Sequence, residues 1–205
     1  GLSLEALDFV IATGYGRIKV EFADKQVTEI SCHAKGISYL FPQVRTVIDI
    51  GGQDSKVIRI NDKGKVIDFA MNDKCAAGTG RFLEVMARAL EVKVEELGEL
   101  SSRAKDSLVI SSMCTVFAES EVVSLIAEGY PKEEIIKGLH NAVADRTVGL
   151  VHRVGLTLEV AMSGGVAKNK GVVSALEEKL GESLNIPSDP QLVGALGAAL
   201  LARDS

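Results

Sequence analysis

Tryptophan is absent from the chain, and aromatic residues are scarce, at 4% of 205 residues. Because hydrophobic residues still make up 46%, the interior has to be built mainly from Val, Ile, Leu and Ala. This composition is typical of α/β proteins with buried parallel strands. The length allows one large domain, or one and a half small ones, with a sizeable core.

An excess of basic residues is also missing, since 23 Lys and Arg face 28 Asp and Glu, which gives a formal charge of -5. Such a chain is not suited to neutralise a phosphate backbone, so nucleic acid is not an expected partner. No uncharged apolar run reaches the roughly 18 residues that cross a bilayer, and the first residues do not resemble a secretory signal. We therefore expect a cytoplasmic protein that binds neither nucleic acid nor membrane.

Cysteine is rare, and three widely spaced residues argue against a disulfide framework. Cys75 and Cys114 lie 39 positions apart (114 minus 75), too far for a local metal knuckle. Each precedes a predicted helix, whose N-terminal dipole lowers a thiol pKa and favours an anionic cluster. Two thiolates cannot complete the four ligands that an iron-sulfur cluster usually takes, whereas two copies of the chain can. The alternatives are a cluster shared by a dimer and two inert, buried thiols.

The third cysteine, Cys32, falls inside a predicted helix, where a packed thiol is the expected role. A zinc site that combines Cys32, His33, Cys75 and Cys114 is the sharper alternative. Four other candidate side chains are expected to be surface or core residues without chemistry, the glutamates because they stabilise a helix dipole without any ligand. They are His140, His152, Glu84 and Glu119.

Hydrophobic periodicity and turn residues predict the order of strands and helices. A strand at 9–12 and a helix at 24–40, which Pro42 ends, form a first βα unit. A meander of three strands follows, and then helices alternate with short strands. The later predicted strands lie at 46–50, 56–60, 66–70, 108–110, 158–162 and 184–186, and the later helices at 81–90, 116–128, 132–154, 170–180 and 191–203. This order predicts an α/β fold with a mixed sheet, helices on both faces, and one boundary at 42–45.

A glycine turn joins the first two strands of the meander, in the run Asp49-Ile50-Gly51-Gly52-Gln53-Asp54. Glycine lets the backbone approach a phosphate, turned-out N–H groups can hold its oxygens, and a carboxylate at a strand end can hold hydrated Mg²⁺. From this motif alone, a tight turn without a ligand is an equally good interpretation.

Two further glycine turns lead into predicted helices: Gly78-Thr79-Gly80, and the run from Ser163-Gly164-Gly165 to Asn169. Strand-to-helix glycine turns are where α/β proteins hold nucleotides, because the helix N-terminus attracts anions. The sequence contains neither a P-loop nor a dinucleotide-binding fingerprint. A nucleotide site would therefore be of another type.

Four runs together carry a family resemblance: 48–54, 72–82 with Cys75, 111–120 with Cys114, and 162–169. In order and spacing they resemble the BadF/BadG/BcrA/BcrD-type ATPase family, most closely the activators (component A) of 2-hydroxyacyl-CoA dehydratases. The resemblance extends over essentially the whole chain. It implies an actin-like ATPase (ribonuclease H-like) fold of two halves, each running three strands, helix, strand, helix, strand, helix.

On this resemblance, residues 1–42 are the remnant of the N-terminal half, and residues 43–205 are the C-terminal half. Asp49 to Asp54 would form the second phosphate loop, and Ser163 to Asn169 the adenosine loop. The family's first phosphate motif, an Asp-x-Gly-Ser run, is not among the 205 residues. We therefore expect this chain alone to lack part of the ATP site.

The resemblance also implies a function, the coupling of ATP binding and hydrolysis to low-potential one-electron transfer. The electron would go to an acyl-CoA dehydratase or an aromatic acyl-CoA reductase, from a ferredoxin or flavodoxin. Cys75 and Cys114 would ligate one 4Fe-4S cluster per homodimer, in an oxygen-sensitive protein of anaerobic metabolism. Catalysis with Mg²⁺ would involve Asp49, Gln53 and Asp54. The implied ATP or ADP contacts are Gly51, Gly52, Gly78, Gly80, Ser163, Gly164, Gly165 and Asn169.

Two other functions stay open at this point. One is a small-molecule kinase of the same actin-like class, in which the cysteines are structural. The other is a non-catalytic domain that dimerises or binds a partner. Nucleotide binding separates the last of these from the others.

Overall fold

The computed structural model describes residue 3 and residues 6–111 and 114–205. Its main sheet has five strands in the order β5-β4-β3-β6-β7. They are β3 (Thr46–Ile50), β4 (Ser55–Ile60), β5 (Val66–Asn72), β6 (Val160–Ser163) and β7 (Leu184–Asn185). β3, β4 and β5 form an antiparallel meander, whereas β6 runs parallel to β3, and β7 parallel to β6. The predicted meander and mixed sheet are both present.

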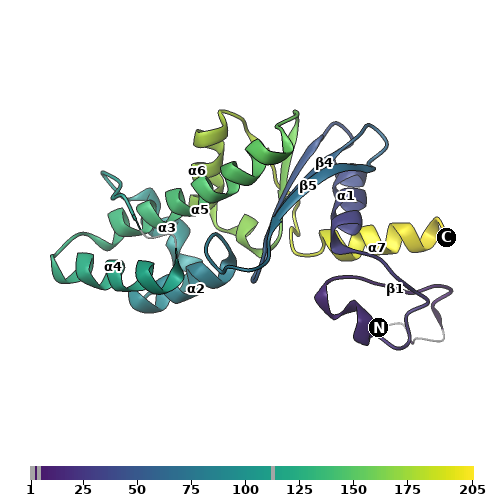
Figure 1. Cartoon of the computed structure of the whole chain (residues 1–205), viewed down its shortest axis with the longest axis horizontal. Helices are drawn as coiled ribbons and strands as arrows, with labels where there is room; N and C mark the ends of the chain where they lie inside the picture. Colours follow the sequence, from purple (N-terminus) through teal and green to yellow (C-terminus); the bar gives the residue numbers. More distant parts are fainter. Residues whose placement is uncertain (1–2, 4–5, 112–113) are drawn as a thin grey trace.

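Helices cover both faces of this sheet (Figure 1). α5 (Lys132–Val154) and α6 (Lys170–Leu180) lie on one side, and α1 (Glu29–Leu40) and α7 (Val193–Arg203) lie on the other. A second group of helices extends away from the sheet. Its members are α2 (Gly80–Ala89), α3 (Leu97–Ser102) and α4 (Thr115–Ala127). The predicted helices at 132–154 and 170–180 coincide with α5 and α6.

The central strand β3 shows why both faces of the sheet are covered. All five of its residues are buried, and successive side chains point to opposite sides of a strand. Ile48 and Ile50 join the larger core, which includes α5, whereas Val47 joins the smaller core, which includes α1. Asp49 is the only charged residue of this strand, and it lies next to the carboxyl end.

The first helix starts later than predicted. β1 (Ile11–Ala12) pairs in parallel with β2 (Lys25–Gln26), and α1 begins only at Glu29. The Thr28 hydroxyl accepts a hydrogen bond from the Ser31 N–H at 3.4 Å and so caps the helix. The prediction of helix at 24–28 is therefore wrong, because these residues form a strand pair and an N-cap instead.

The predicted strand at 108–110 is also wrong. These residues run across α5 rather than beside another strand, and the Leu108 N–H donates to the Glu134 carbonyl at 3.4 Å. A Cβ at Gly138 of α5 would overlap the Leu108 carbonyl oxygen. A short apolar run is similar in sequence whether it pairs with a strand or packs on a helix. Within the described ranges, no helix combines the length and the apolar character that crossing a membrane requires.

Candidate functional site

The carboxyl ends of β3 and β6 meet at one edge of the sheet, where Asp49 lies opposite Ser163 in the parallel register. The Ser163 hydroxyl donates to Asp49 Oδ1 at 2.9 Å, and both side chains are buried. Open α/β sheets bind ligands at the carboxyl ends of their strands. The fold thus brings the turn at 51–54 next to the turn at 164–168, although the two are far apart in sequence.

A buried lysine joins the two aspartates of the first turn. Lys56 Nζ lies 3.1 Å from Asp49 Oδ2 and 2.8 Å from Asp54 Oδ1, and Lys56 is only 3% exposed. Burial alone would lower the pKa of the Lys56 ammonium, but the attraction and hydrogen bonds of the two carboxylates outweigh burial and raise it. The lysine stays charged, so one cation and two carboxylates leave the cluster with a single net negative charge.

Lys56 is absent from the residues predicted for the site. Its signal in the sequence is a charged side chain in the apolar run Ser55-Lys56-Val57-Ile58, since a buried strand position normally excludes an unpaired lysine. The tight turn between the strands places Lys56 opposite Asp49 in the hairpin register. Counting residues outward from the turn could have predicted this pair.

Helix α1 contributes His33 to the same cluster. His33 Nδ1 lies 3.1 Å from Ser163 Oγ and 3.3 Å from Asp49 Oδ1. Because Ser163 gives its proton to Asp49, its oxygen is free to accept a hydrogen bond from a protonated Nδ1. His33 and Ser163 are 130 residues apart in sequence, so this contact depends on the packing of α1 and had no local signal.

Two adjoining cavities open beside the cluster and share Gly51, Gly165 and Gln191 in their walls. The first, of about 300 Å³, contains the charged cluster, and its other lining residues are Gly14, Tyr15, Glu29, His33, Asp49, Asp54, Lys56 and Gly164. The second, of about 530 Å³, has a mixed lining formed also by Gly52, Gly80, Leu83, Glu84, Val94, Glu95, Val166, Lys168 and Asn169. A ligand with phosphates at one end and a nucleoside at the other matches this division. We call the two cavities together the nucleotide cleft.

The first turn is also hydrogen-bonded to the start of α2. The Gly80 N–H donates to the Gly51 carbonyl at 2.8 Å, and the Arg81 N–H donates to the Gly52 carbonyl at 2.9 Å. A Cβ at residue 80 would lie 3.2 Å from the Gly51 oxygen, so glycine makes this approach possible. A shift of this turn would therefore be transmitted to the N-terminus of α2.

The family described as the BadF/BadG/BcrA/BcrD ATPase family matches residues 1–202. The chain belongs to this family. The activator of lactoyl-CoA dehydratase from Anaerotignum propionicum is 56% identical over 205 residues, which are 100% of this chain and 79% of that protein. The solved structure of (R)-2-hydroxyglutaryl-CoA dehydratase component A from Acidaminococcus fermentans is 54% identical, with a TM-score of 0.96 over 99% of this chain and 78% of that chain.

A second solved structure adds a ligand to this comparison. The activator of the 2-hydroxyisocaproyl-CoA dehydratase from Clostridium difficile, with bound ADPNP, is 51% identical, with a TM-score of 0.96 over 100% of this chain and 76% of that chain. MreB 5 of Spiroplasma citri is 14% identical, with a TM-score of 0.53 over 96% of this chain and 68% of that chain, a likeness in fold alone. The resemblance and the actin-like fold predicted from the sequence are confirmed.

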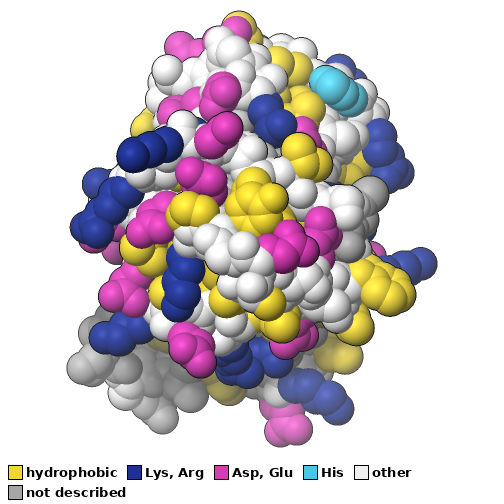
Figure 2. All heavy atoms as spheres, turned by 90° about the vertical axis from the view of Figure 1, so that its left-hand side faces the viewer, with side chains coloured by type: hydrophobic (Ala, Val, Ile, Leu, Met, Phe, Trp, Pro, Cys, Tyr) yellow, Lys and Arg dark blue, Asp and Glu magenta, His cyan; other side chains and the backbone are white. Residues whose placement is uncertain are grey.

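In this member of the BadF/BadG/BcrA/BcrD ATPase family, Cys75 and Cys114 each precede a helix. Cys75 is half-buried between β5 and α2, and Asn72 Nδ2 donates to its carbonyl at 2.8 Å. Cys114 is exposed at the N-cap of α4, while residues 112 and 113 of the same run lie outside the described residues. The end of the molecule that carries α2 and α4 shows apolar side chains among acidic and basic ones (Figure 2).

The zinc alternative is wrong for this chain. Cys32 lies on the buried face of α1, where burial raises the pKa of its thiol, whereas Cys114 is exposed at the N-cap of α4. Among the residues that the structure describes, no three His, Cys, Asp or Glu side chains are arranged to hold a metal ion. The role predicted for Cys32, a packed thiol, is confirmed.

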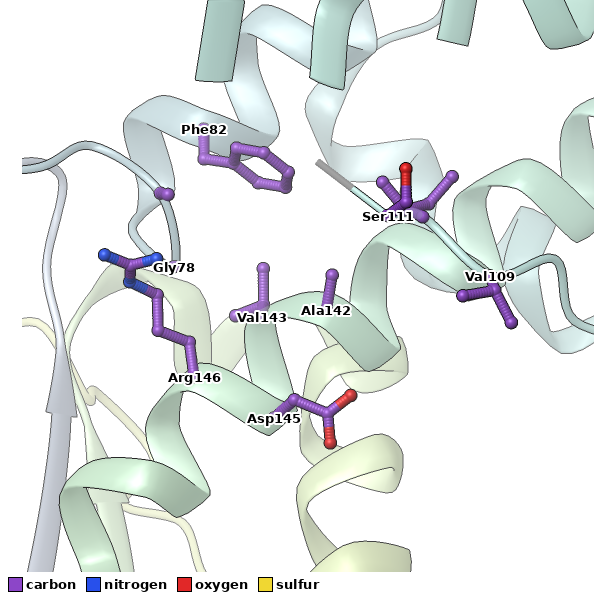
Figure 3. Close-up of a pocket in the computed structure, with 10 residues that line it drawn as sticks. Gly78, Phe82, Val109, Ser111, Ala142, Val143, Asp145 and Arg146 are labelled. Atoms are coloured by element: carbon purple, nitrogen blue, oxygen red, sulfur yellow. The ribbon is translucent and has the colours of Figure 1, made fainter. Parts of the chain in front are cut away.

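A third cavity, of about 390 Å³, lies between the two cysteine segments (Figure 3). Gly78 lines it from the Cys75 side, Ser111 from the Cys114 side, and Arg146 from α5. The resemblance places Gly78 among the nucleotide contacts, but in the structure it packs against the Arg146 side chain and is absent from the wall of the nucleotide cleft. Gly78 does not reach the nucleotide cleft because the loop before α2 turns it toward Arg146 of α5, whereas Gly80 faces Gly51.

Two residues for which the sequence predicts no ligand-binding or catalytic role lie close to the nucleotide cleft. Glu84 lines its second cavity and forms an ion pair with Arg81 at 3.0 Å. His140 is buried behind the turn at 164–168, with Nδ1 3.0 Å from Ser101 Oγ and Nε2 3.2 Å from Asn169 Nδ2. Burial lowers the pKa of His140 to about 4, so the ring is neutral in the folded protein at neutral pH.

His140 should make stability depend on pH. Its pKa is about 6.5 in an unfolded chain and about 4 in the folded protein, so the unfolded chain takes up the proton first as the pH falls. Stability is lost between these two values, and we expect His140 to lower the free energy of unfolding by about 2 kcal/mol between pH 7 and pH 5. Urea unfolding at both pH values should show a correspondingly smaller loss in His140→Gln. An equal pH dependence of the two proteins would contradict this assignment.

Proposed function

We propose that this protein is a nucleotide-dependent iron-sulfur activator of an acyl-CoA dehydratase. The observation that carries the proposal is the pair of hydrogen bonds from the Gly80 and Arg81 N–H groups to the carbonyls of Gly51 and Gly52. They join the turn that would hold phosphates to the helix that directly follows the Cys75 loop. A change of nucleotide could thereby alter the surroundings of Cys75 without any mobile lid.

The nucleotide would occupy the nucleotide cleft. Its phosphates would lie at Gly51 and Gly52, beside the cluster of Asp49, Lys56 and Asp54, and its adenosine would lie along the turn from Gly164 to Asn169. The single net negative charge of these three side chains supports the binding of hydrated Mg²⁺ near the phosphates. The ADPNP bound in the similar Clostridium difficile activator supports the same assignment.

The two cysteines fit an iron-sulfur cluster shared by two copies of the chain. Each copy would provide Cys75 and Cys114, and two copies provide the four thiolates that such a cluster usually takes. When bound, the cluster supplies a one-electron carrier whose potential depends on hydrogen bonds, burial and charge. Val116 and Phe117, in the first turn of α4 after Cys114, are 67% and 68% exposed, and Val109 of the segment before it is 87% exposed. This apolar surface supports contact with a second copy.

An acyl-CoA dehydratase is the favoured partner, because the similar proteins described above are named as activators or components of such enzymes. A small redox protein, a ferredoxin or flavodoxin, would supply the electron. The kinase function and the non-catalytic function considered from the sequence have less support, since the same relatives point to activation and one of them holds a nucleotide analogue.

Cysteine substitutions test the proposed iron-sulfur cluster. After anaerobic reconstitution with iron and sulfide, the wild-type protein is expected to carry about four iron atoms per two chains and to elute as a dimer. Cys75→Ser and Cys114→Ser should each lose most of the iron and of the visible absorbance, because a hydroxyl replaces a thiolate ligand. The matched control Cys32→Ala should keep both, since Cys32 is on the buried face of α1.

Calorimetric titration with ADP on the same four proteins tests the nucleotide half separately. All four are expected to bind ADP, because the cysteines are not in the walls of the nucleotide cleft. Iron content that is unchanged in both serine variants would contradict the ligation of an iron-sulfur cluster by Cys75 and Cys114. A folded wild-type protein that does not bind ADP would contradict the activator function itself.

A further inference from the structure

Behind the turn from Gly164 to Asn169, called the adenosine turn below, one continuous series of hydrogen bonds joins three buried or half-buried polar side chains. They are Asn169, His140 and Ser101. We propose that His140 is a positioning residue for the nucleotide cleft: it holds the Asn169 side-chain amide at the wall of the cleft and ties that wall to α5. The inference rests on the proposed nucleotide binding and adds a residue that the family resemblance did not indicate.

The hydrogen bonds fix the orientation of each group. Asn169 Oδ1 accepts from the N–H groups of Gly171 and Val172 at 3.0 and 3.3 Å, which caps α6. The amide nitrogen of Asn169 must therefore face His140, and it donates to Nε2 at 3.2 Å. With Nε2 as the acceptor, neutral His140 carries its proton on Nδ1 and donates to Ser101 Oγ at 3.0 Å.

The series of hydrogen bonds continues into α3 and ends there. The Ser101 hydroxyl donates to the Gly98 carbonyl at 3.1 Å, so each link of the series pairs one donor with one acceptor. The space around the ring is filled, because a Cβ at Gly171 would overlap the His140 ring and approach the Ser101 hydroxyl. His140 is therefore held in one place by hydrogen bonds on both ring nitrogens and by close packing on α6.

The turn of α5 that carries His140 also contacts the segment leading to Cys114. Gly138 packs against the Leu108 carbonyl, and Asn141 Nδ2 donates to Ser107 Oγ at 2.8 Å. One helical turn thus touches Asn169 on one side and residues 107–108 on the other. A nucleotide that presses on Asn169 would act on this turn, in addition to the connection from Gly51 to α2.

A pair of amide substitutions separates the two hydrogen bonds of the ring. The side-chain amide of His140→Gln reaches the position of Nε2 and can still accept from Asn169, whereas that of His140→Asn reaches only the position of Nδ1 and keeps the contact with Ser101. We expect His140→Gln to bind ADP within about twofold of the wild type, and His140→Asn to bind about three- to tenfold more weakly. A role confined to stability would change the affinity of both variants equally or not at all.

Nuclear magnetic resonance of the protein labelled with ¹⁵N-histidine gives a second readout. His140 should show the tautomer protonated on Nδ1, and its signals should shift when ADP is added, while those of the exposed His152 on the same helix should not. Wild-type binding of ADP with equal affinities of the two variants would overturn the role of His140 alone. A folded wild-type protein that does not bind ADP would overturn the proposed function and this inference together.

Discussion

Replacing Lys56 by methionine is expected to lower the free energy of unfolding by about 3–5 kcal/mol. The change removes the ammonium that lies 3.1 Å from Asp49 and 2.8 Å from Asp54, and it leaves two buried carboxylates without a counter-charge. Methionine is close to lysine in length, so the loss reports the missing charge more than missing volume. Urea unfolding at pH 7 measures it. Titration with ADP should show binding at least about tenfold weaker, because both aspartates flank the phosphate turn.

Two further variants make the result specific to the buried charge. Lys63→Met, in the exposed turn between β4 and β5, should change the stability by less than about 0.5 kcal/mol. The neutral triple variant Asp49→Asn/Lys56→Met/Asp54→Asn should recover much of the stability, since no uncompensated charge remains buried, but it should not recover ADP binding. Lys56→Met with wild-type stability would show that the three charges are not coupled in the folded protein.

The parts of the site that could be predicted from the sequence are those with a local signal. The turn after Asp49 and the turn after Ser163 stand out because glycines follow a buried apolar strand, and the parallel pairing of β3 with β6 then makes them neighbours. Cys75 and Cys114 could be placed before helices for a similar reason, since the apolar periodicity of α2 and α4 begins just after them.

The parts that could not be predicted depend on tertiary packing. His33 reaches Ser163 only because α1 lies against the sheet, and no periodicity within α1 distinguishes His33 from a surface residue. His140 likewise meets Asn169 through the contact of α5 with α6. The wrong strand at 108–110 has the same origin, since its partner is Gly138 of a helix rather than another strand.

The arrangement also shows how one short turn can serve two purposes. The side chains of Asp49 and Asp54 are held by Lys56, while the carbonyls of Gly51 and Gly52 accept hydrogen bonds from α2. The carboxylates therefore face the proposed Mg²⁺, and the two carbonyls are committed to the helix that follows Cys75. In the proposed function, these two sets of contacts of one turn would link the nucleotide to the iron-sulfur cluster.

Replacing Gly164 by alanine is expected to destabilise the protein by about 2–6 kcal/mol, because its backbone conformation and its packing both oppose a side chain. Gly164 has a φ of 86°, and a Cβ there would overlap the Ile50 carbonyl oxygen and lie 3.0 Å from Asp49 Oδ1. With a ψ of 171°, Gly164 lies in a backbone region essentially confined to glycine, which costs an alanine about 1–3 kcal/mol. Overpacking adds about 1–3 kcal/mol. Because Ile50 and Asp49 end β3, they can yield only by moving the phosphate turn, so ADP binding should weaken at least about tenfold as well. Urea unfolding and calorimetric titration measure the two effects.

Gly52→Ala is the matched control, because it changes a glycine of the other turn in the same cleft. No atom lies within 4 Å of a Cβ built at Gly52, and its φ is outside the left-handed region. Its stability should therefore stay within about 0.5 kcal/mol of the wild type. Equal losses in the two alanine variants would mean that glycine turns here are sensitive in general. A loss confined to Gly164→Ala would instead show that the close approach of the adenosine turn to the end of β3 holds the two halves of the cleft together.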